Sequence, residues 1–204
     1  MGSDPICNVG SAWLPSALVT DVPLLDRLEP TTRRALVDAG RRVDVAVGEI
    51  VTHDSGSEGS VFLVLDGLLK VVKRSTSGRV AFLALCRPGT LVGELAMLTD
   101  SPRSSTVQAV EASTVAEIRR ERFEQLLDEH PDLGTELLAL IADRIRASTA
   151  QIHDQTNADA TTRIARRLIQ LADAASSADV DELTLRLPIS QEELGDWAGL
   201  SRAG

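Results

Sequence analysis

The chain has 204 residues and a formal net charge of −9, and 43% of its residues are hydrophobic. This length allows one full domain plus a smaller second one, with a sizeable core. The negative charge excludes a protein that binds polyanions over its whole surface, so any contact with DNA must be local. No apolar run approaches the roughly 18 residues of a membrane-spanning helix, and no basic stretch precedes an apolar one at the N-terminus. We therefore expect a cytoplasmic protein without a membrane partner.

Two cysteines and three histidines limit the metal and redox chemistry of the chain. Cys7 and Cys86 are too few and too far apart for a disulfide framework or a four-thiolate iron–sulfur cluster, and the histidine spacing is not typical of zinc, so we expect no metal. A haem held by Cys86 or a histidine stays open as an alternative, although its ligands cannot be placed. Because tyrosine is absent and aromatic residues make up 2% of the chain, a bound base would be held by aliphatic walls and hydroxyl groups.

The first residues, 1–20, mix Gly, Ser and Pro with isolated apolar residues, which is typical of a flexible lead-in before a short helix. From residue 42 to residue 119, glycines separate short β-rich runs about every 8 to 11 residues, a spacing that predicts a sandwich or barrel. The expected strands lie at 61–65, 68–73, 80–85 and, as a last pair, within 107–118. Residues 21–130 therefore form one predicted domain.

The segment between Leu91 and Val107 interrupts this β-series with a short helical turn and two side chains of opposite charge. Gly93 allows a sharp turn before Glu94, and the orphan N–H groups of a helical turn that starts there attract negative charge. Arg103 offers a planar fork that can hold two phosphate oxygens, whereas the Glu94 carboxylate accepts hydrogen bonds from hydroxyl groups. A phosphate and a sugar in one compact ligand describe a nucleotide. The alternative is an ordinary surface turn with a capped helix, because short motifs also occur by chance.

This segment resembles the phosphate-binding cassette of cyclic-nucleotide-binding domains, in which Gly-Glu-Leu-Ala is followed by Pro-Arg and small residues. The resemblance implies that Glu94 binds the ribose 2′-hydroxyl, Arg103 the cyclic phosphate, and Ser104 a phosphate oxygen. Gly93 and Leu95 complete the predicted ligand-binding residues of the cassette. The resemblance also implies an α+β fold, in which an antiparallel β-roll, or jelly roll, carries the pocket of a sensor domain.

A short helix up to residue 130 is followed by a longer predicted helix over residues 131–157. Its inward positions recur in steps of three and four, the pattern of a coiled-coil seam. The seam positions are Leu138, Ile141, Ile145, Ser148, Ile152 and Gln155. We interpret this segment as the dimerisation helix of a homodimer. The alternative is a monomeric helix packed on the β-roll, because Leu137 and Leu140 offer a second apolar side.

Two hydroxyl residues, Ser148 and Thr149, lie on or beside this seam, where leucine would pack better. In the cyclic-AMP receptor protein family, which this region resembles, the corresponding pair reaches the adenine, with one hydroxyl from each subunit. The resemblance therefore implies that Ser148 and Thr149 contact the base of cyclic AMP. The alternative is that both hydroxyls bond back to carbonyl groups of the preceding helical turn.

The last predicted domain, residues 158–204, begins with a helix over residues 160–175. Arg163, Arg166 and Arg167 lie off its apolar stripe, and we expect them to form a solvated face. A strand is expected at residues 183–187, where apolar and polar residues alternate.

The segment from Ser190 to Arg202 has the order typical of a helix-turn-helix. Ser190 and Glu193 form a capping box, a glycine marks the turn, and Ser201 would cap the next helix. Resemblance to winged-helix regulators of the CRP/FNR type implies that Ser201 and Arg202 belong to the DNA-binding part. Since only two residues follow Arg202, we expect an incomplete winged helix-turn-helix domain, from a fragment of a longer regulator.

Three pieces agree in order along the chain: the cassette, the hydroxyl-bearing helix and the start of a helix-turn-helix. Together the resemblances imply a homodimeric CRP/FNR transcription regulator with cyclic AMP as effector. Its expected partners are the nucleotide, a second copy bound through residues 131–157, double-stranded DNA and RNA polymerase. Two alternatives stay open: a sensor domain for another small effector, and a signalling module that docks on a protein without reading DNA. The sequence contains no nucleophile elbow and no phosphate-binding Gly-Lys-Ser/Thr loop, so we expect no enzyme.

Overall fold

The structure, a computed structural model, describes 23–54, 59–74, 80–99, 101–175 and the five residues 190, 191, 194, 195 and 198. The predicted lead-in at 1–20, the strand at 183–187, and Ser201 and Arg202 lie outside the described residues. Within the described residues, the helices are too short or too polar to cross a bilayer.

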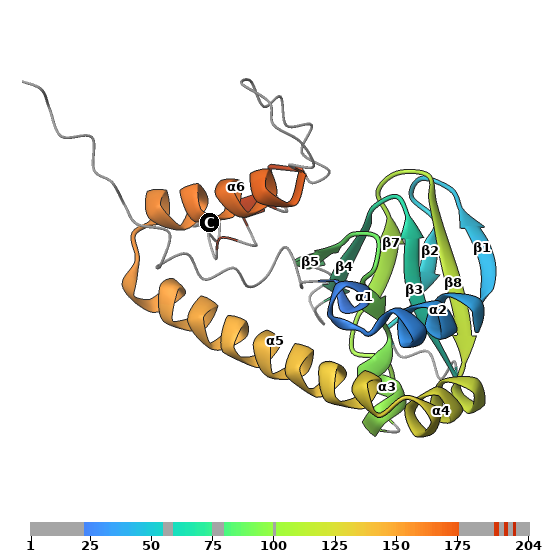
Figure 1. The fold of residues 1–204 in the computed structure, drawn as a ribbon. Coiled ribbons are helices and arrows are strands. Elements are labelled where there is room, and N and C mark those ends of the chain that lie inside the picture. Colours follow the sequence, from blue (N-terminus) through green and yellow to red (C-terminus); the bar gives the residue numbers. More distant parts are fainter. Residues whose placement is uncertain are drawn as a thin grey trace, which may run out of the picture.

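In the described part of the chain, eight antiparallel strands form two four-stranded sheets that face each other (Figure 1). The first sheet has the order β1-β8-β3-β6 and the second the order β2-β7-β4-β5. The strands are β1 (Arg41–Val45), β2 (Ile50–Thr52), β3 (Ser60–Asp66), β4 (Leu69–Arg74), β5 (Val80–Cys86), β6 (Leu91–Val92), β7 (Thr106–Ala109) and β8 (Ser113–Arg119). The predicted α+β class with an antiparallel β-roll is therefore confirmed, and the predicted last pair of strands corresponds to β7 and β8.

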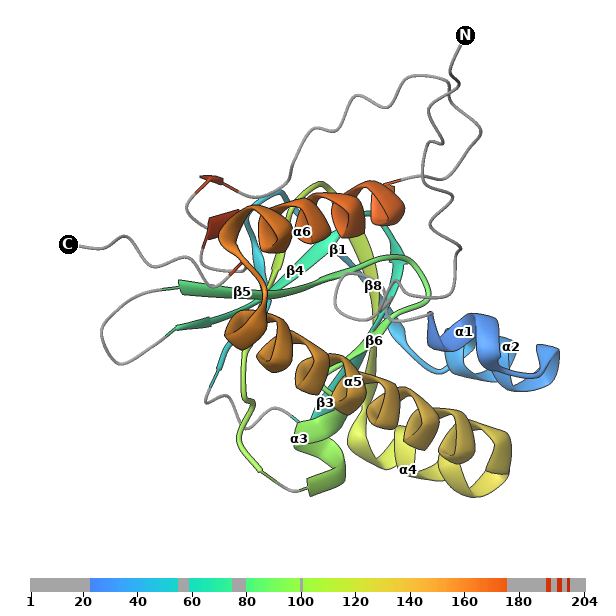
Figure 2. The same cartoon turned by 90° about the vertical axis from the view of Figure 1, so that its left-hand side faces the viewer.

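Six helices are described, of which the first five contribute to the core beside the first sheet and the sixth follows the end of the fifth. They are α1 (Leu24–Arg27), α2 (Pro30–Asp38), α3 (Glu94–Thr99), α4 (Arg120–Glu129), α5 (Pro131–Asn157) and α6 (Ala160–Ala175). Pro131 is the first residue of α5, a position whose N–H group makes no hydrogen bond within a helix, so the missing N–H of proline costs nothing there. Figure 2 shows α5 crossing the face of the roll beside α3 and leading to α6.

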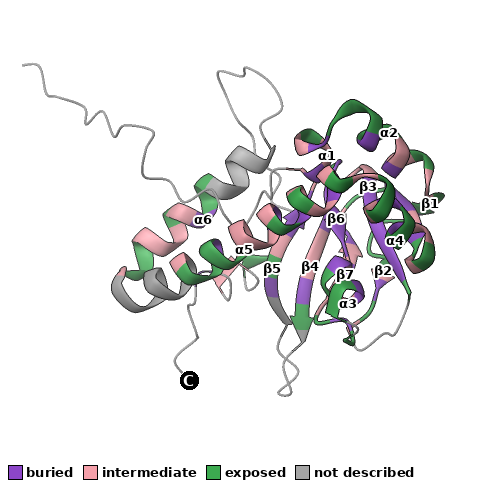
Figure 3. Ribbon diagram, turned by 60° about the horizontal axis from the view of Figure 1, so that its bottom comes forward, coloured by how far each residue is buried: buried purple, intermediate pink, exposed green. Residues whose placement is uncertain are grey.

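The core has two parts, and alternate side chains of β3 belong to different parts because successive residues of a strand point to opposite faces of the sheet. Val61 and Leu63 pack toward the helices, whereas Phe62 and Val64 point into the space between the two sheets. The helix-side part includes Leu24, Leu28, Leu36, Leu91, Ile118, Phe123, Leu126, Leu133, Leu137 and Leu140. Figure 3 shows this burial along the inner sides of strands and helices. Helices α1 to α5 are therefore held to the roll by a continuous apolar layer.

Helix α5 has one buried and one exposed apolar side. Leu137 and Leu140 are at most 2% exposed against the roll, whereas Leu138 and Ile145 are 70% and 62% exposed. Packing on the roll, the alternative weighed for this helix, thus occupies one side. Of the predicted seam, Leu138 and Ile145 stay exposed in the single chain, whereas Ile141 is partly buried against the helix-side core. The role of that seam in dimerisation stays a prediction.

The arginines of α6 do not form the solvated face that their position off the apolar stripe suggested. Arg167 is 7% exposed, and Arg163 is half-buried. Arg163 donates through Nε to the carbonyl oxygen of Ala198 at 2.8 Å and through Nη1 to that of Ala158 at 2.9 Å. The expectation was wrong for these two residues, and at Arg163 the reason is that the carbonyl oxygens of Ala158 and Ala198 accept hydrogen bonds from its guanidinium group.

Candidate functional site

A cavity of about 290 Å³ lies where the second sheet meets α3 and α5. Its walls are mostly aliphatic, as the shortage of aromatic residues led us to expect, and its charged side chains lie near the start of α3. The wall residues include Val71, Leu83, Leu85, Val92 and Val107. An apolar cavity of this size with a few convergent polar side chains is typical of a small-molecule site.

Gly93 and Arg103 fit each other closely at the polar end of the cavity. Gly93 has φ +88°, and a Cβ built on it would collide with Nη1 of Arg103 and lie 3.2 Å from its Cζ. The Arg103 side chain is 5% exposed, donates through Nη2 to the Ser60 carbonyl oxygen at 2.5 Å, and lies 5.5 Å from the centre of the Phe62 ring. The glycine therefore leaves the space in which this guanidinium is held.

Glu94, the first residue of α3, is 2% exposed and forms an ion pair with Nη1 of Arg144. Arg144 belongs to α5 and also donates through Nη2 to the Leu91 carbonyl oxygen at 3.4 Å. A carboxylate has about four acceptor positions, so Glu94 can accept further hydrogen bonds beside this arginine. The ion pair joins the cassette directly to the long helix.

Hydroxyl groups reach the cavity from two directions. Ser104 follows Arg103 in the cassette, and Ser148 lies one turn beyond Arg144 on α5; both line the cavity. Thr149 does not line it in the single chain, and its Oγ1 donates to the Ile145 carbonyl oxygen at 3.0 Å. The back-bonding considered for both hydroxyls is therefore seen at Thr149.

The structure thus brings six of the seven predicted ligand residues around one cavity: Gly93, Glu94, Leu95, Arg103, Ser104 and Ser148. Sequence reasoning missed Arg144. A signal was present, because Arg144 precedes Ser148 by four residues, and residues four apart share a helix face. Any face of the helix that presents Ser148 to a ligand also presents Arg144.

Two guanidinium groups and one carboxylate converge on this end of the cavity. Their summed charge favours an anion, and the buried carboxylate adds acceptors for hydroxyl donors. Among the residues that the structure describes, there is no cluster of three His, Cys, Asp or Glu side chains that could hold a metal ion. The arrangement is that of a binding site for a small phosphorylated sugar derivative.

Comparison with known proteins agrees with this chemistry. Residues 42–130 match the family described as "Cyclic nucleotide-binding domain". The chain is similar to the CRP-like cAMP-activated global transcriptional regulator of Mycobacterium tuberculosis, with 25% identity over 86% of this chain and 78% of that protein. It is similar to the cAMP-activated global transcriptional regulator CRP of Escherichia coli, with 29% identity over 74% of this chain and 71% of that protein.

The fold also matches a solved structure, that of the c-di-GMP responsive global regulator CLP of Xanthomonas campestris. The TM-score is 0.69 and the identity 22%, with 85% of this chain and 86% of that chain covered. A different kind of match is the lysophospholipase nte1 of Aspergillus oryzae, which is 32% identical over 65% of this chain but only 9% of that enzyme. The relatives of Mycobacterium tuberculosis and Escherichia coli, which match over most of both chains, are transcriptional regulators, whereas the enzyme matches over a small part of its length.

Proposed function

We propose that the chain is a transcription regulator of the CRP/FNR type, that its cavity binds cyclic AMP, and that binding controls a homodimer which recognises DNA. The observation that carries this proposal is the convergence of buried Glu94 and buried Arg103 on one cavity. A buried carboxylate and a buried guanidinium are costly unless something compensates their charges. Arg144 already pairs with the Glu94 carboxylate, and a ligand with an anionic phosphate and hydroxyl donors adds a favourable partner for each of the two buried groups.

The geometry supports a division of roles within the cavity. The cyclic phosphate lies against the Arg103 guanidinium and the Ser104 hydroxyl, and the ribose 2′-hydroxyl donates to the Glu94 carboxylate beside Arg144. The base lies along the aliphatic walls toward Ser148 of α5. Thr149 contacts the base bound to the second subunit, so each ligand touches the helix of both subunits.

Effector binding can change the position of α5 because that helix carries part of the site. An effector shifts an equilibrium between two arrangements only if it binds them with different free energies. Contacts to Arg144 and Ser148 supply such a difference, since both residues move with α5 whereas Glu94 and Arg103 move with the roll. The chain continues from α5 into α6, where Asp159 caps the helix by accepting from the Thr162 N–H at 2.8 Å.

The proposed output is regulation of transcription through residues 158–204 and contact with RNA polymerase. Support comes from the regulators matched over most of their length and from the helical hydrogen bonds Leu194 N to Ser190 O and Ala198 N to Leu194 O, both at 2.9 Å. Those bonds lie at the start of the segment in which we predict Ser201 and Arg202 to contact double-stranded DNA.

Titration calorimetry of the purified chain with cyclic AMP, cyclic GMP and cyclic di-GMP tests the proposal. We expect saturable binding of cyclic AMP, weaker binding of the other two, and a loss of about 2 to 5 kcal/mol of binding free energy in Arg103→Ala. Arg119→Ala is the matched control, because Arg119 is exposed and does not line the cavity. Absence of cyclic AMP binding, or equal binding by both variants, would overturn the assignment.

A further inference from the structure

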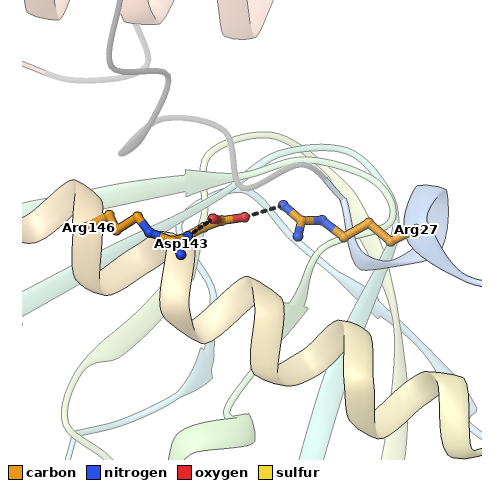
Figure 4. A network of polar contacts seen from close by, with 3 residues as sticks. All are labelled: Arg27, Asp143 and Arg146. Carbon is orange, nitrogen blue, oxygen red and sulfur yellow. Dashed lines mark hydrogen bonds and ion pairs between the residues drawn. The ribbon is translucent and has the colours of Figure 1, made fainter.

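An ion pair outside the cavity connects the N-terminal helices to α5. Nη2 of Arg27, on α1, lies 2.8 Å from Oδ2 of Asp143, on α5, and Nη1 of Arg146 lies 2.7 Å from the other oxygen of the same carboxylate (Figure 4). The Arg27 side chain is 18% exposed, whereas that of Arg146 is 75% exposed. Only Arg27 joins different elements of the fold, because Arg146 and Asp143 belong to the same helix.

The N-terminal helices also contact α5 near its start. Thr32 of α2 donates through Oγ1 to Oδ1 of Asp132 at 2.8 Å, and the backbone N–H of Glu29 donates to Oδ2 at 3.3 Å. Asp143 lies eleven residues after Asp132. Eleven residues make about three helical turns, so both carboxylates lie on nearly the same face of α5. The helix pair α1 and α2 therefore contacts one face of α5 over three turns.

The N-terminal helices are themselves fixed to the β-roll. Leu24 and Leu28 are at most 5% exposed and belong to the helix-side core. The backbone N–H of Leu25 donates to the Gly89 carbonyl oxygen, in the turn between β5 and β6, at 3.2 Å. Because α1 is anchored to the roll in this way, the ion pair of Arg27 opposes any movement of α5 relative to the roll.

The turn of α5 that Arg27 contacts is the turn that enters the cavity. Arg144 directly follows Asp143, and Ser148 lies one turn further; both line the cavity, whereas Arg27 and Asp143 do not. A shift or rotation of α5 at Asp143 would therefore displace Arg144 from Glu94. The hydrogen bond from Arg27, with a further contribution from Arg146, holds the pKa of Asp143 below its usual value, as expected for a carboxylate engaged in the folded state.

We propose that Arg27 and Asp143 are positioning residues of the effector site, which hold the cavity-facing turn of α5 in the place where Arg144 and Ser148 meet the ligand. The inference rests on the proposed function, since it assigns the N-terminal helices to the effector-binding unit. With the pair intact, the cavity-facing turn of α5 is already in its binding position, so the ligand does not spend binding free energy on positioning that turn. Loss of the pair raises the dissociation constant although no ligand contact is removed.

The size of the effect is limited by the strength of the pair. Breaking the pair cannot weaken ligand binding by more than the free energy that the pair contributes to the arrangement of α5. Partly exposed ion pairs contribute little, so we expect a roughly two- to fivefold increase in the dissociation constant for cyclic AMP.

The test compares Arg27→Met with Arg146→Met by calorimetry, well below the unfolding temperature of each variant. Methionine keeps the apolar stem of arginine and removes its donors. We expect weaker binding in Arg27→Met and wild-type binding in Arg146→Met. Adding Arg27→Met to an Arg144→Met variant should have a smaller effect than in the wild type, because the residue being positioned is then gone.

Hydrogen exchange of the ligand-free protein provides a second readout. The backbone amides of α5 around Asp143 should exchange faster in Arg27→Met than in Arg146→Met. Equal dissociation constants for Arg27→Met and wild type, or equal effects of both substitutions on binding, would overturn the inference. A wild-type chain that binds no cyclic nucleotide would instead overturn the proposed function, so the two failures are distinguishable.

Discussion

Substitution of Gly93 by alanine should lower the free energy of unfolding for two separate reasons. The first is backbone strain, because φ +88° lies in the region that alanine adopts at a cost of about 1 to 2 kcal/mol. The second is the collision of the new Cβ with the Arg103 guanidinium, whose Cζ would lie at 3.2 Å. Displacing that guanidinium breaks its hydrogen bond to the Ser60 carbonyl oxygen.

A hydrogen bond to a charged group contributes about 1.5 to 3 kcal/mol. Gly93→Ala should therefore lower the free energy of unfolding by about 2.5 to 5 kcal/mol, once strain and displacement are combined. It should also weaken cyclic AMP binding by at least about tenfold, because a displaced Arg103 no longer faces the phosphate.

Gly48→Ala is the matched control. Gly48 has φ +80°, so alanine meets similar strain there, but nothing lies within 4 Å of the point that its new Cβ would occupy. Urea unfolding should show a loss of about 1 to 2 kcal/mol for Gly48→Ala, and calorimetry should show unchanged binding. If Gly93→Ala loses no more stability than Gly48→Ala and binds cyclic AMP normally, the proposed packing of Arg103 on Gly93 is wrong.

Three further predictions concern the ligand, the seam and pH. Glu94→Ala should abolish the preference for cyclic AMP over its 2′-deoxy form in competition binding, and an equal loss for both ligands would refute the ribose role. Leu138→Glu should convert a dimer into monomers in sedimentation, whereas the similarly exposed Val47→Glu should not. The Arg27 hydrogen bond lowers the folded-state pKa of Asp143 below its usual value of 3.8. The stability that this pair contributes is therefore complete above pH 3.8, and it is lost as the pH falls through the lowered pKa of the folded state. The stability difference between wild type and Arg27→Met should therefore shrink in acid denaturation below about pH 4, and a constant difference would contradict the pairing.

Local patterns predicted the elements of this fold well. The helices over 131–157 and 160–175 begin and end at the predicted residues, because a proline or polar break marks each boundary. The strands follow from glycine-separated β-rich runs, and the two-residue alternation in β3 decides which side chains face each core. These features depend on neighbours in sequence, so one sequence is enough to find them.

Contacts between distant elements were less predictable. The partner of Glu94 lies 50 residues away on α5, and the carbonyl that accepts from Arg163 lies 35 residues away. An arginine on a helix surface has the same local pattern whether it faces solvent or a buried acceptor. The cassette could be recognised from its own residues, but Arg144 becomes visible only when the long helix is laid against the roll.

Helix α5 combines two contacts and one exposed apolar side on a single rigid element. Leu137 and Leu140 pack on the roll, Arg144 pairs with the cassette, and Leu138 with Ile145 remains exposed. Leu138 and Ile145 are seven residues apart, the spacing at which helix positions return to the same side of a coiled coil. Because helical hydrogen bonds fix these faces relative to one another, a ligand that changes the place of Arg144 also changes the direction in which the exposed side points. In the proposed homodimer, coupling between the effector and the subunit contact then needs no path through the protein beyond the helix itself, and the proposed role of the Arg27–Asp143 pair is to set the position from which that movement starts.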